Sequence, residues 1–303
     1  MTFALAGCAG AGSGSAAMPT GVSPITAPTA SPCAATRSAP PGQSTHTVKV
    51  GSVTRSWVEY VPKTYDGASS RPVVITLHGL GSDGAQHLAA TGWTTIADRD
   101  NVVVLSPDAL GKPTQWDLLA ARRSNADVDF IEALLVSVSE RLCVAPSVSL
   151  NGISNGSAFA ATLTCALGDR VRAVAFVATT YQPRDCGRTS PVTVVAFHGT
   201  DDKVVPYSGG RSEVLPIVVP AVESAIVDWA YGDGCAIKPA DQQLSSEVTR
   251  RAFAGCRGGT TVELYIIAGG GHTWPGGPAV ERFGRTTTQI NATEVMWKVF
   301  SRT

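Results

Sequence analysis

Three residues whose side chains could together carry out acyl transfer stand in separate glycine-marked loops of this chain: Ser154, Asp202 and His272. In such a set the histidine takes the serine proton, the serine oxygen attacks an ester carbonyl, and the carboxylate holds the histidine tautomer. The same three groups occur in other chain orders in chymotrypsin and subtilisin, whereas serine, acid, histidine is the α/β-hydrolase order. The set therefore predicts ester hydrolysis through an acyl-enzyme.

Ser154 follows an apolar, strand-like run and precedes a helix-compatible stretch, within the motif Gly152-Ile-Ser154-Asn-Gly156. Such a turn exposes the serine hydroxyl, and its two glycines let the strand and the helix approach closely. A chain with 31 glycines produces this motif easily by chance. The strand and helix patterns on either side therefore carry most of the prediction.

His272 and the acid each follow a strand-like run. His272 comes after residues 261–267 and lies between glycines, which let its imidazole turn inward; an isolated histidine there would more often decorate a surface loop, and the chain order favours a general base. The run 191–197 ends in His198-Gly-Thr-Asp201-Asp202. Either aspartate could hold the histidine or cap a turn, and the residues alone do not choose between them.

An oxyanion hole requires backbone N–H groups aimed at the charge that develops on the carbonyl oxygen. Asn155, the residue after the serine, supplies the first of these groups. The second is expected from the loop after the strand-like run 72–77; we assign the N–H of Leu80, while Gly79 or Gly81 could also serve. His78 is interpreted as a hydrogen bonder that fixes this loop rather than as a second base.

The elements that must position these groups alternate between strand and helix patterns, which indicates an α/β protein with a mostly parallel central sheet and helices on both faces. The catalytic loops then all lie at the carboxyl ends of strands. Residues 206–220 fit no core strand and could overhang the site. We expect a hairpin (45–49 and 55–61), strands ending at 77 and over 102–105, 171–177, 192–197 and 261–267, and helices over 85–98, 128–141, 221–230 and 292–300.

Composition limits the classes of function. With 303 residues and 44% hydrophobic content, the chain can bury one substantial core, so we expect a single catalytic domain over residues 45–303. The 24 basic residues balance the 24 acidic ones, which argues against nucleic acid as a partner. No metal-binding, Walker or dinucleotide motif occurs, so we predict no metal and no cofactor. We expect a monomer.

Residues 1–44 form a separate leader. Ala, Gly, Ser, Thr and Pro dominate residues 9–44, a composition that cannot bury enough surface to order itself, and we predict a tether. Just before it, Leu5-Ala6-Gly7-Cys8 resembles the lipobox at which bacterial lipoproteins are acylated on cysteine. Its apolar part is too short for a signal core, so we interpret it as a truncated lipoprotein signal with Cys8 as the lipidation site, an accidental match being the alternative.

The other six cysteines are compatible with disulfides in an oxidising compartment, the alternative being buried free thiols. The most local pairing is Cys235 with Cys256, which would contribute about 3 kcal/mol in the chain-entropy model. Cys165 with Cys186 is the next choice, and Cys33 with Cys143 follows by elimination. A secreted or membrane-anchored protein is the resulting expectation for its location.

The chain also resembles a known family, the esterases grouped with polyhydroxybutyrate depolymerases and feruloyl esterases. The resemblance runs from about residue 45 to the end and implies an α/β-hydrolase fold and a secreted or lipid-anchored esterase. In the family pattern H-G-T-x-D the acid is the fifth residue, which selects Asp202; Ser157 departs from the family, which usually has glycine there. The matching motifs are His78-Gly-Leu-Gly81, Asp108-Ala-Leu-Gly with Trp116, Leu142-Cys-Val, Gly152-Ile-Ser-Asn-Gly156, His198-Gly-Thr-Asp-Asp202, Val205-Pro-Tyr207 and Gly271-His-Thr-Trp-Pro-Gly276.

The resemblance implies polyhydroxyalkanoate-type polyesters or feruloyl and acetyl esters of plant cell walls as substrates. Trp116, Tyr207 and Trp274 could line the substrate site or pack in the core. Two other functions use the same scaffold: an acyltransferase of the mycolyl-transfer kind and a non-catalytic surface-binding protein. The complete triad argues against the second, and a hydrolysis-to-transfer ratio would test the first.

Overall fold

The computed structural model describes residues 2, 33, 36–121, 124–183, 186–212 and 214–303. The predicted lipidation site, Cys8, and most of the predicted tether lie outside these residues. The first strand begins at Gly42, so the predicted domain boundary between residues 44 and 45 falls inside this strand. Before it, the Arg37 N–H donates to Gly67 O at 2.9 Å, so the domain includes residues that we assigned to the tether.

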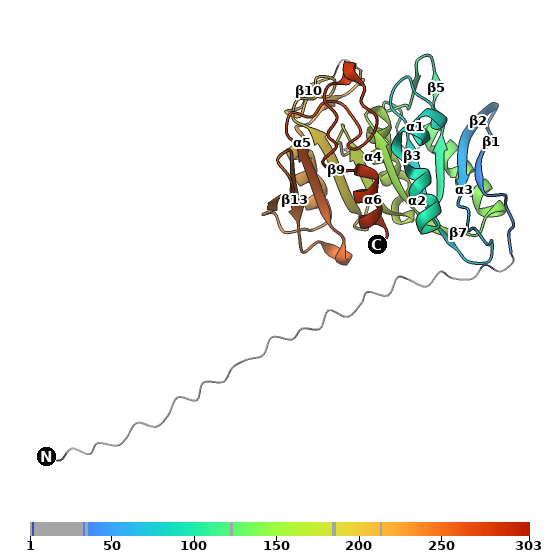
Figure 1. Ribbon diagram of the computed structural model, residues 1–303, viewed down its shortest axis with the longest axis horizontal. Coiled ribbons are helices and arrows are strands. Elements are labelled where there is room, and N and C mark those ends of the chain that lie inside the picture. The colour runs from blue at the N-terminus through green and yellow to red at the C-terminus, as the bar shows by residue number, and fades with distance from the viewer. Residues whose placement is uncertain (1, 3–32, 34–35, 122–123, 184–185, 213) are drawn as a thin grey trace.

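A ten-stranded sheet forms the centre of the molecule, in the order β1-β2-β4-β3-β7-β8-β9-β14-β13-β12 (Figure 1). The six strands from β4 to β14 are parallel, and β1, β2, β13 and β12 extend the sheet antiparallel at its two edges. Their bounds are β1 Gly42–Val50, β2 Val53–Val61, β3 Arg71–Leu77, β4 Val103–Pro107, β7 Val144–Ile153, β8 Val171–Val177, β9 Thr193–Gly199, β12 Ala240–Gln243, β13 Val248–Phe253 and β14 Val262–Ile267.

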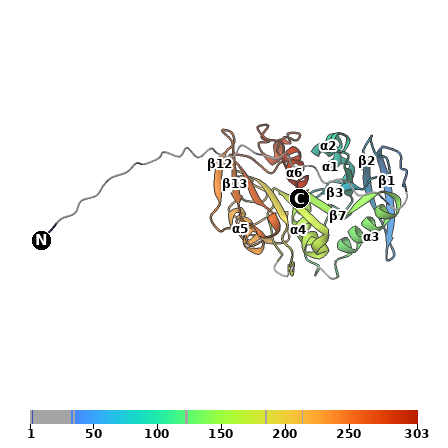
Figure 2. The same cartoon turned by 90° about the horizontal axis from the view of Figure 1, so that it is seen from below.

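Helices cover both faces of the sheet, as Figure 2 shows. Helices α1 (Gly84–Thr91), α2 (Trp93–Asp100) and α6 (Ala292–Phe300) pack on one face through buried residues such as Trp93 and Met296. Helices α3 (Ala126–Arg141), α4 (Asn155–Leu167) and α5 (Val222–Gly232) pack on the other through residues such as Phe159 and Trp229. Burial on both faces explains why inner strands such as β8 are almost entirely apolar.

Short elements complete the fold. Two small hairpins stand outside the main sheet, and the second belongs to the segment that we expected to overhang the site. Their strands are β5 Leu110–Gly111, β6 Thr114–Gln115, β10 Gly210–Arg211 and β11 Val218–Val219, and the 3-10 turns are η2 Gly168–Arg170, η3 Arg257–Gly259 and η4 Glu281–Phe283.

Most predicted elements are confirmed, including the leading hairpin, the strand over 171–177 and the closing helix over 292–300. The single helix predicted over 85–98 is wrong, because the structure divides this segment into α1 and α2. Gly92 lies between the two helices with a left-handed φ of 74°, a conformation that ends a helix and that glycine adopts without strain.

The sequence analysis missed β12 and β13, since β13 lacks an apolar strand pattern. Ion pairs with neighbouring elements stabilise it instead. Arg250 Nε lies 2.9 Å from Glu263 Oε2 on β14. Arg251 Nε lies 2.8 Å from Asp241 Oδ1 on β12, and its Nη1 lies 2.7 Å from Glu223 on α5. This edge is therefore a strand pair held by charges, which hydrophobic periodicity does not detect.

Three disulfides join the cysteines in the pairings favoured from the sequence: Cys33–Cys143, Cys165–Cys186 and Cys235–Cys256. The first joins the segment before β1 to the residue that precedes β7, and the last joins the turn after α5 to the loop between β13 and β14. Among the described residues, no helix has both the length and the apolar character needed to cross a bilayer.

Candidate active site

Ser154 occupies a strained turn between β7 and α4, with φ 57° and ψ −122°. Two close backbone contacts hold this turn. A Cβ atom on Gly152 would lie 2.6 Å from the Gly156 carbonyl carbon, and one on Gly156 would lie 2.3 Å from His78 O. The Ser154 N–H also donates to Val177 O at 2.9 Å. The turn has the geometry of a nucleophile elbow, in which packing maintains an unfavourable backbone conformation.

Asp202 and His272 meet because their loops follow the adjacent parallel strands β9 and β14. His272 Nδ1 and Asp202 Oδ2 lie 2.7 Å apart, and both side chains are buried. Asp201 faces solvent and contacts Lys203. The structure thus places Asp202, and not its neighbour, against the histidine.

Asp202 is held as a carboxylate. Its Oδ1 accepts the N–H groups of Val204 and Val205 at 2.9 and 2.8 Å, and its Oδ2 lies 3.4 Å from His198 Nε2. Burial raises the pKa of Asp202, but hydrogen bonds from His198 and His272, and the positive charge of His272 when it is protonated, outweigh burial and hold the pKa below its ordinary value. The charged acid therefore keeps the proton on His272 Nδ1, which leaves Nε2 as a proton acceptor.

Ser154 and His272 line one pocket, although no hydrogen bond joins Ser154 Oγ to His272 among the described residues. A long or missing contact of this kind is common before substrate binds. Both residues therefore border the same cavity.

The backbone N–H groups that the sequence analysis predicted for an oxyanion hole lie in the loop after β3 and at the start of α4. The N–H groups of Leu80 and Asn155 have no acceptor within the described part of the chain, as expected for Asn155 in the first turn of a helix. The Gly81 N–H donates to Thr114 O at 2.8 Å and is therefore occupied. Of the three candidates for the second donor, Leu80 and Gly79 remain.

His78 fixes this loop, as the sequence analysis expected. Its Nε2 accepts the Ala109 N–H at 3.0 Å, so its Nδ1 carries the proton and donates to Gly79 O at 2.7 Å. Burial lowers the pKa of His78, so the ring is neutral. With both ring nitrogens engaged and no charge, His78 positions the loop rather than acting as a base.

Trp116 is a core residue and does not line the pocket, so the structure does not support a role as a substrate wall. Its ring is 1% exposed and stacks on Phe159 with centroids 4.8 Å apart. Its N–H donates to Asn155 Oδ1 at 2.7 Å, and its indole N–H donates to His78 O at 3.0 Å. Trp116 therefore stabilises both predicted oxyanion loops by hydrogen bonds from the core.

Tyr207 likewise lies outside the pocket lining. Its hydroxyl donates to Glu223 at 3.1 Å, and its ring meets the edge of His198 with centroids 5.8 Å apart. Tyr207 thus packs against His198, the histidine that contacts Asp202. Trp274, by contrast, lines the pocket, and its indole N–H donates to Thr293 at 3.1 Å.

The pocket has a volume of about 490 Å³, and apolar and aromatic side chains form most of its wall. The sequence analysis missed several residues that line it, among them His87 on α1 and Phe283 in η4. The Phe283 ring meets the His272 ring edge-on at 5.9 Å. No signal in the sequence distinguishes His87 from a histidine on the surface of a helix, since its role depends on the loops folded over it.

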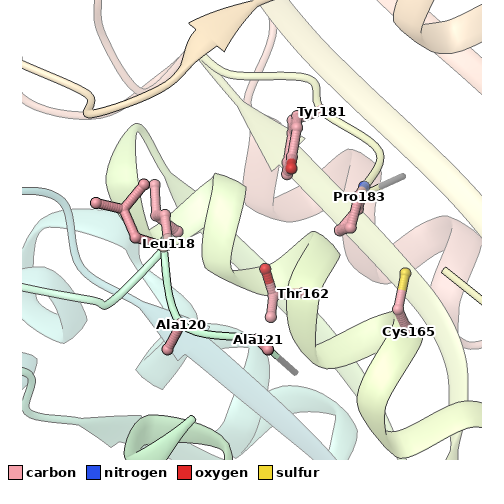
Figure 3. Close-up of a pocket in the computed structure, with 8 residues that line it drawn as sticks. Leu118, Ala120, Ala121, Thr162, Cys165, Tyr181 and Pro183 are labelled. Atoms are coloured by element: carbon pink, nitrogen blue, oxygen red, sulfur yellow. The ribbon is translucent and has the colours of Figure 1, made fainter. Parts of the chain in front are cut away.

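A second, smaller hollow of about 240 Å³ lies elsewhere on α4 (Figure 3). Thr162 and Cys165 of α4 line it together with Leu118 and residues from the segment after β8, such as Tyr181. It contains no histidine or carboxylate among its described lining residues, and Cys165 is bonded in a disulfide. Nor does any group of three or more metal-ligating side chains gather in the described ranges of the chain.

Comparison with known proteins gives relatives that are esterases, although no family model matches the chain. It is 26% identical over 222 residues to feruloyl esterase B of Piromyces equi, covering 70% of this chain and 41% of that protein. It is 24% identical over 245 residues to feruloyl esterase D of Neurospora crassa, covering 75% and 77%. The chain therefore spans less than half the length of the Piromyces equi protein.

Among solved structures, the acetyl xylan esterase from Aspergillus awamori superposes with a TM-score of 0.56 at 13% identity, over 76% of this chain and 94% of that one. At this identity the likeness concerns the fold. Together with the mostly parallel sheet covered by helices on both faces, it shows that the chain has the α/β-hydrolase fold, as predicted.

Proposed function

We propose that the protein is a serine-dependent carboxylic ester hydrolase in which Ser154 is the nucleophile, His272 the general base and Asp202 the acid that orients it. The observation that carries this proposal is the 2.7 Å contact between Asp202 and His272. His272 lines the same pocket as Ser154, which lies on a strained turn. The similarity to feruloyl esterases supports the same chemistry.

The reaction proceeds in two halves. His272 Nε2 takes the Ser154 proton while Oγ attacks the ester carbonyl carbon, and the N–H groups of Leu80 and Asn155 bind the resulting oxyanion. Collapse of this intermediate breaks the bond to the alcohol, which leaves with the proton from His272. Water then attacks the acyl-enzyme by the same route and releases the acid.

The substrates we propose are feruloyl or acetyl esters of plant cell walls, or polyhydroxyalkanoate-type polyesters. The apolar pocket with Trp274 in its wall also has room for an acyl group larger than acetyl. Three disulfides support an oxidising, extracytoplasmic location. Lipid anchoring through Cys8 is a further proposal that rests on the lipobox resemblance.

The test is hydrolysis of p-nitrophenyl acyl esters, methyl ferulate, acetylated xylan and hydroxybutyrate oligomers by the purified protein. Ser154→Ala should lower kcat by about 10⁶ while leaving the thermal midpoint close to that of the wild type. Activity of this variant within tenfold of wild type would rule out the nucleophile. An added alcohol acceptor separates hydrolysis from acyl transfer: predominant transfer would favour the acyltransferase alternative.

A further inference from the structure

His87 lies on α1, is buried and lines the same pocket as Ser154. A network of hydrogen bonds behind it determines which of its nitrogens carries the proton. Thr76 Oγ1 donates its one proton to Asn151 Oδ1 at 2.6 Å. Thr76 Oγ1 can therefore only accept from His87 Nε2, which lies 2.9 Å away. His87 is consequently protonated on Nε2, and its Nδ1 carries a lone pair.

Asn151 makes this arrangement rigid. Its Oδ1 also accepts the indole N–H of Trp93 at 3.3 Å, while its Nδ2 donates to Ile75 O at 3.4 Å. The amide orientation is thereby fixed by partners on both sides, and it directs the Thr76 proton away from His87. The imidazole tautomer is a consequence of buried groups on strands β3 and β7.

Burial lowers the pKa of His87 to about 3, so the ring is neutral under ordinary assay conditions. Its Nδ1 has no hydrogen-bond partner among the described residues, yet it is not sealed from the pocket. Trp274 meets the ring edge-on, with centroids 5.5 Å apart. His87 Nδ1 is thus an uncharged hydrogen-bond acceptor in the pocket wall, next to the aromatic ring of Trp274.

We infer that the acyl group of the ester is the part that reaches this acceptor. The alcohol must leave, and water must enter, on the side where His272 delivers its proton, so that side has to be open. Phe283 contacts His272, and the neighbouring Val280 and Arg282 are exposed, which marks the open rim. Behind His87 and Trp274 the pocket wall is closed, because Thr293 of α6 accepts the Trp274 indole N–H and donates its own proton to Thr91 O of α1. A group that stays bonded to Ser154 can rest against this wall.

We propose that His87 is a specificity-determining residue whose Nδ1 accepts a hydrogen bond from a hydroxyl group on the acyl part of the substrate, so that the enzyme favours esters of hydroxy acids. This inference rests on the proposed esterase function. A methyl group in place of that hydroxyl would leave Nδ1 desolvated and unpaired, which costs more than the loss of a contact.

Two pairs of esters that exchange hydroxyl for methyl test the preference: methyl 4-hydroxycinnamate with methyl 4-methylcinnamate, and methyl 3-hydroxybutyrate with methyl 3-methylbutyrate. We expect the ratio of kcat/KM values, hydroxyl over methyl, to exceed about 5 for at least one pair in the wild type, as one neutral hydrogen bond would give. Ratios near one for both pairs would overturn the proposal.

Two substitutions of His87 then separate recognition of the substrate hydroxyl from the structural bond to Thr76. Each new side chain places one polar atom at the position of one ring nitrogen. The amide nitrogen of His87→Gln reaches the position of Nε2 and keeps the bond to Thr76, but it removes the acceptor at Nδ1. The amide oxygen of His87→Asn replaces Nδ1 but cannot reach Thr76. The hydroxyl preference should fall to near one in His87→Gln and persist in His87→Asn, even where the latter has the lower thermal midpoint.

An unchanged preference in His87→Gln, or an equal loss in both variants, would contradict recognition by Nδ1. Failure of the underlying function is distinguished by the methyl-bearing esters. Their hydrolysis by the wild type and its loss in Ser154→Ala support the esterase whatever the ratio, whereas no hydrolysis of any ester would remove both proposals together.

Discussion

Ser154, at the end of β7, is fixed by backbone atoms in contact, whereas Arg251, on the outer strand β13, is held by side-chain ion pairs near the surface. Around the serine, glycines bring β7, α4 and the His78 loop closer than any side chain would allow. Around Arg251, the partners Glu223 and Asp241 are about half exposed. Small changes should therefore be costly at the first region and mild at the second.

The largest contrast that we predict within the site itself is between the adjacent aspartates. Asp202→Asn should lower kcat by up to about 10⁴, because an amide cannot keep the proton on His272 Nδ1. Asp201→Asn is the matched control and should stay within tenfold of wild type, since Asp201 faces solvent. Steady-state kinetics on a p-nitrophenyl ester measures both, and the reverse ranking would move the acid to Asp201.

Gly156→Ala should destabilise the protein by about 1–3 kcal/mol or more, because the new methyl group would lie 2.3 Å from His78 O and 2.4 Å from Leu77 O. Gly232→Ala is the control, since its Cβ would meet no atom closer than 3.5 Å. Denaturant unfolding measures both free energies. Equal unfolding free energies of the two variants would mean that the backbone around Ser154 adjusts easily to the added methyl group. The region around Ser154 would then be no more sensitive to substitution than the region around Arg251.

Asp202 also predicts a dependence of stability on pH. Because its pKa is lowered in the folded protein, its charged form stabilises the fold fully above the unfolded value of about 4, and that contribution is lost as the pH falls below it. Unfolding free energies of the wild type should thus decrease more steeply on acidification than those of Asp202→Asn. Parallel curves between about pH 5 and pH 2 would show that Asp202 is not stabilised as a carboxylate.

Arg251→Ala gives the smallest expected effect. Exposed ion pairs contribute about 0.2–1 kcal/mol, and part of that is screened by salt. Unfolding at low and high ionic strength should show a small loss that shrinks further with added salt. A loss of unfolding free energy above about 3 kcal/mol is typical of a broken buried ion pair. It would show that the region around Arg251 is as sensitive to substitution as the region around Ser154.

These regions also differ in how far the sequence predicts them. The runs before Ser154, Asp202 and His272 are apolar because both faces of those strands are buried, so periodicity and glycine motifs locate them together. Strand β13 carries arginines whose partners are distant in the chain, and no local pattern indicates them.

The interior of the site is predicted least well. Trp116 and Tyr207 lie next to catalytic motifs in the sequence, yet they pack behind the loops rather than in the pocket. His87 gains its place only from the packing of α1 against β3 and β4. Side-chain direction within a loop depends on such tertiary contacts, which residue type and spacing do not encode.

The central claim, that Ser154 becomes acylated, is tested most directly by reacting the protein with a p-nitrophenyl phosphonate ester and mapping the modified peptide by mass spectrometry. We predict stoichiometric release of p-nitrophenol, one added phosphonyl group on Ser154 and loss of esterase activity in proportion, with no modification of Ser154→Ala. Labelling of a different residue that accounts for the inactivation, or equal labelling of Ser154→Ala, would contradict the account.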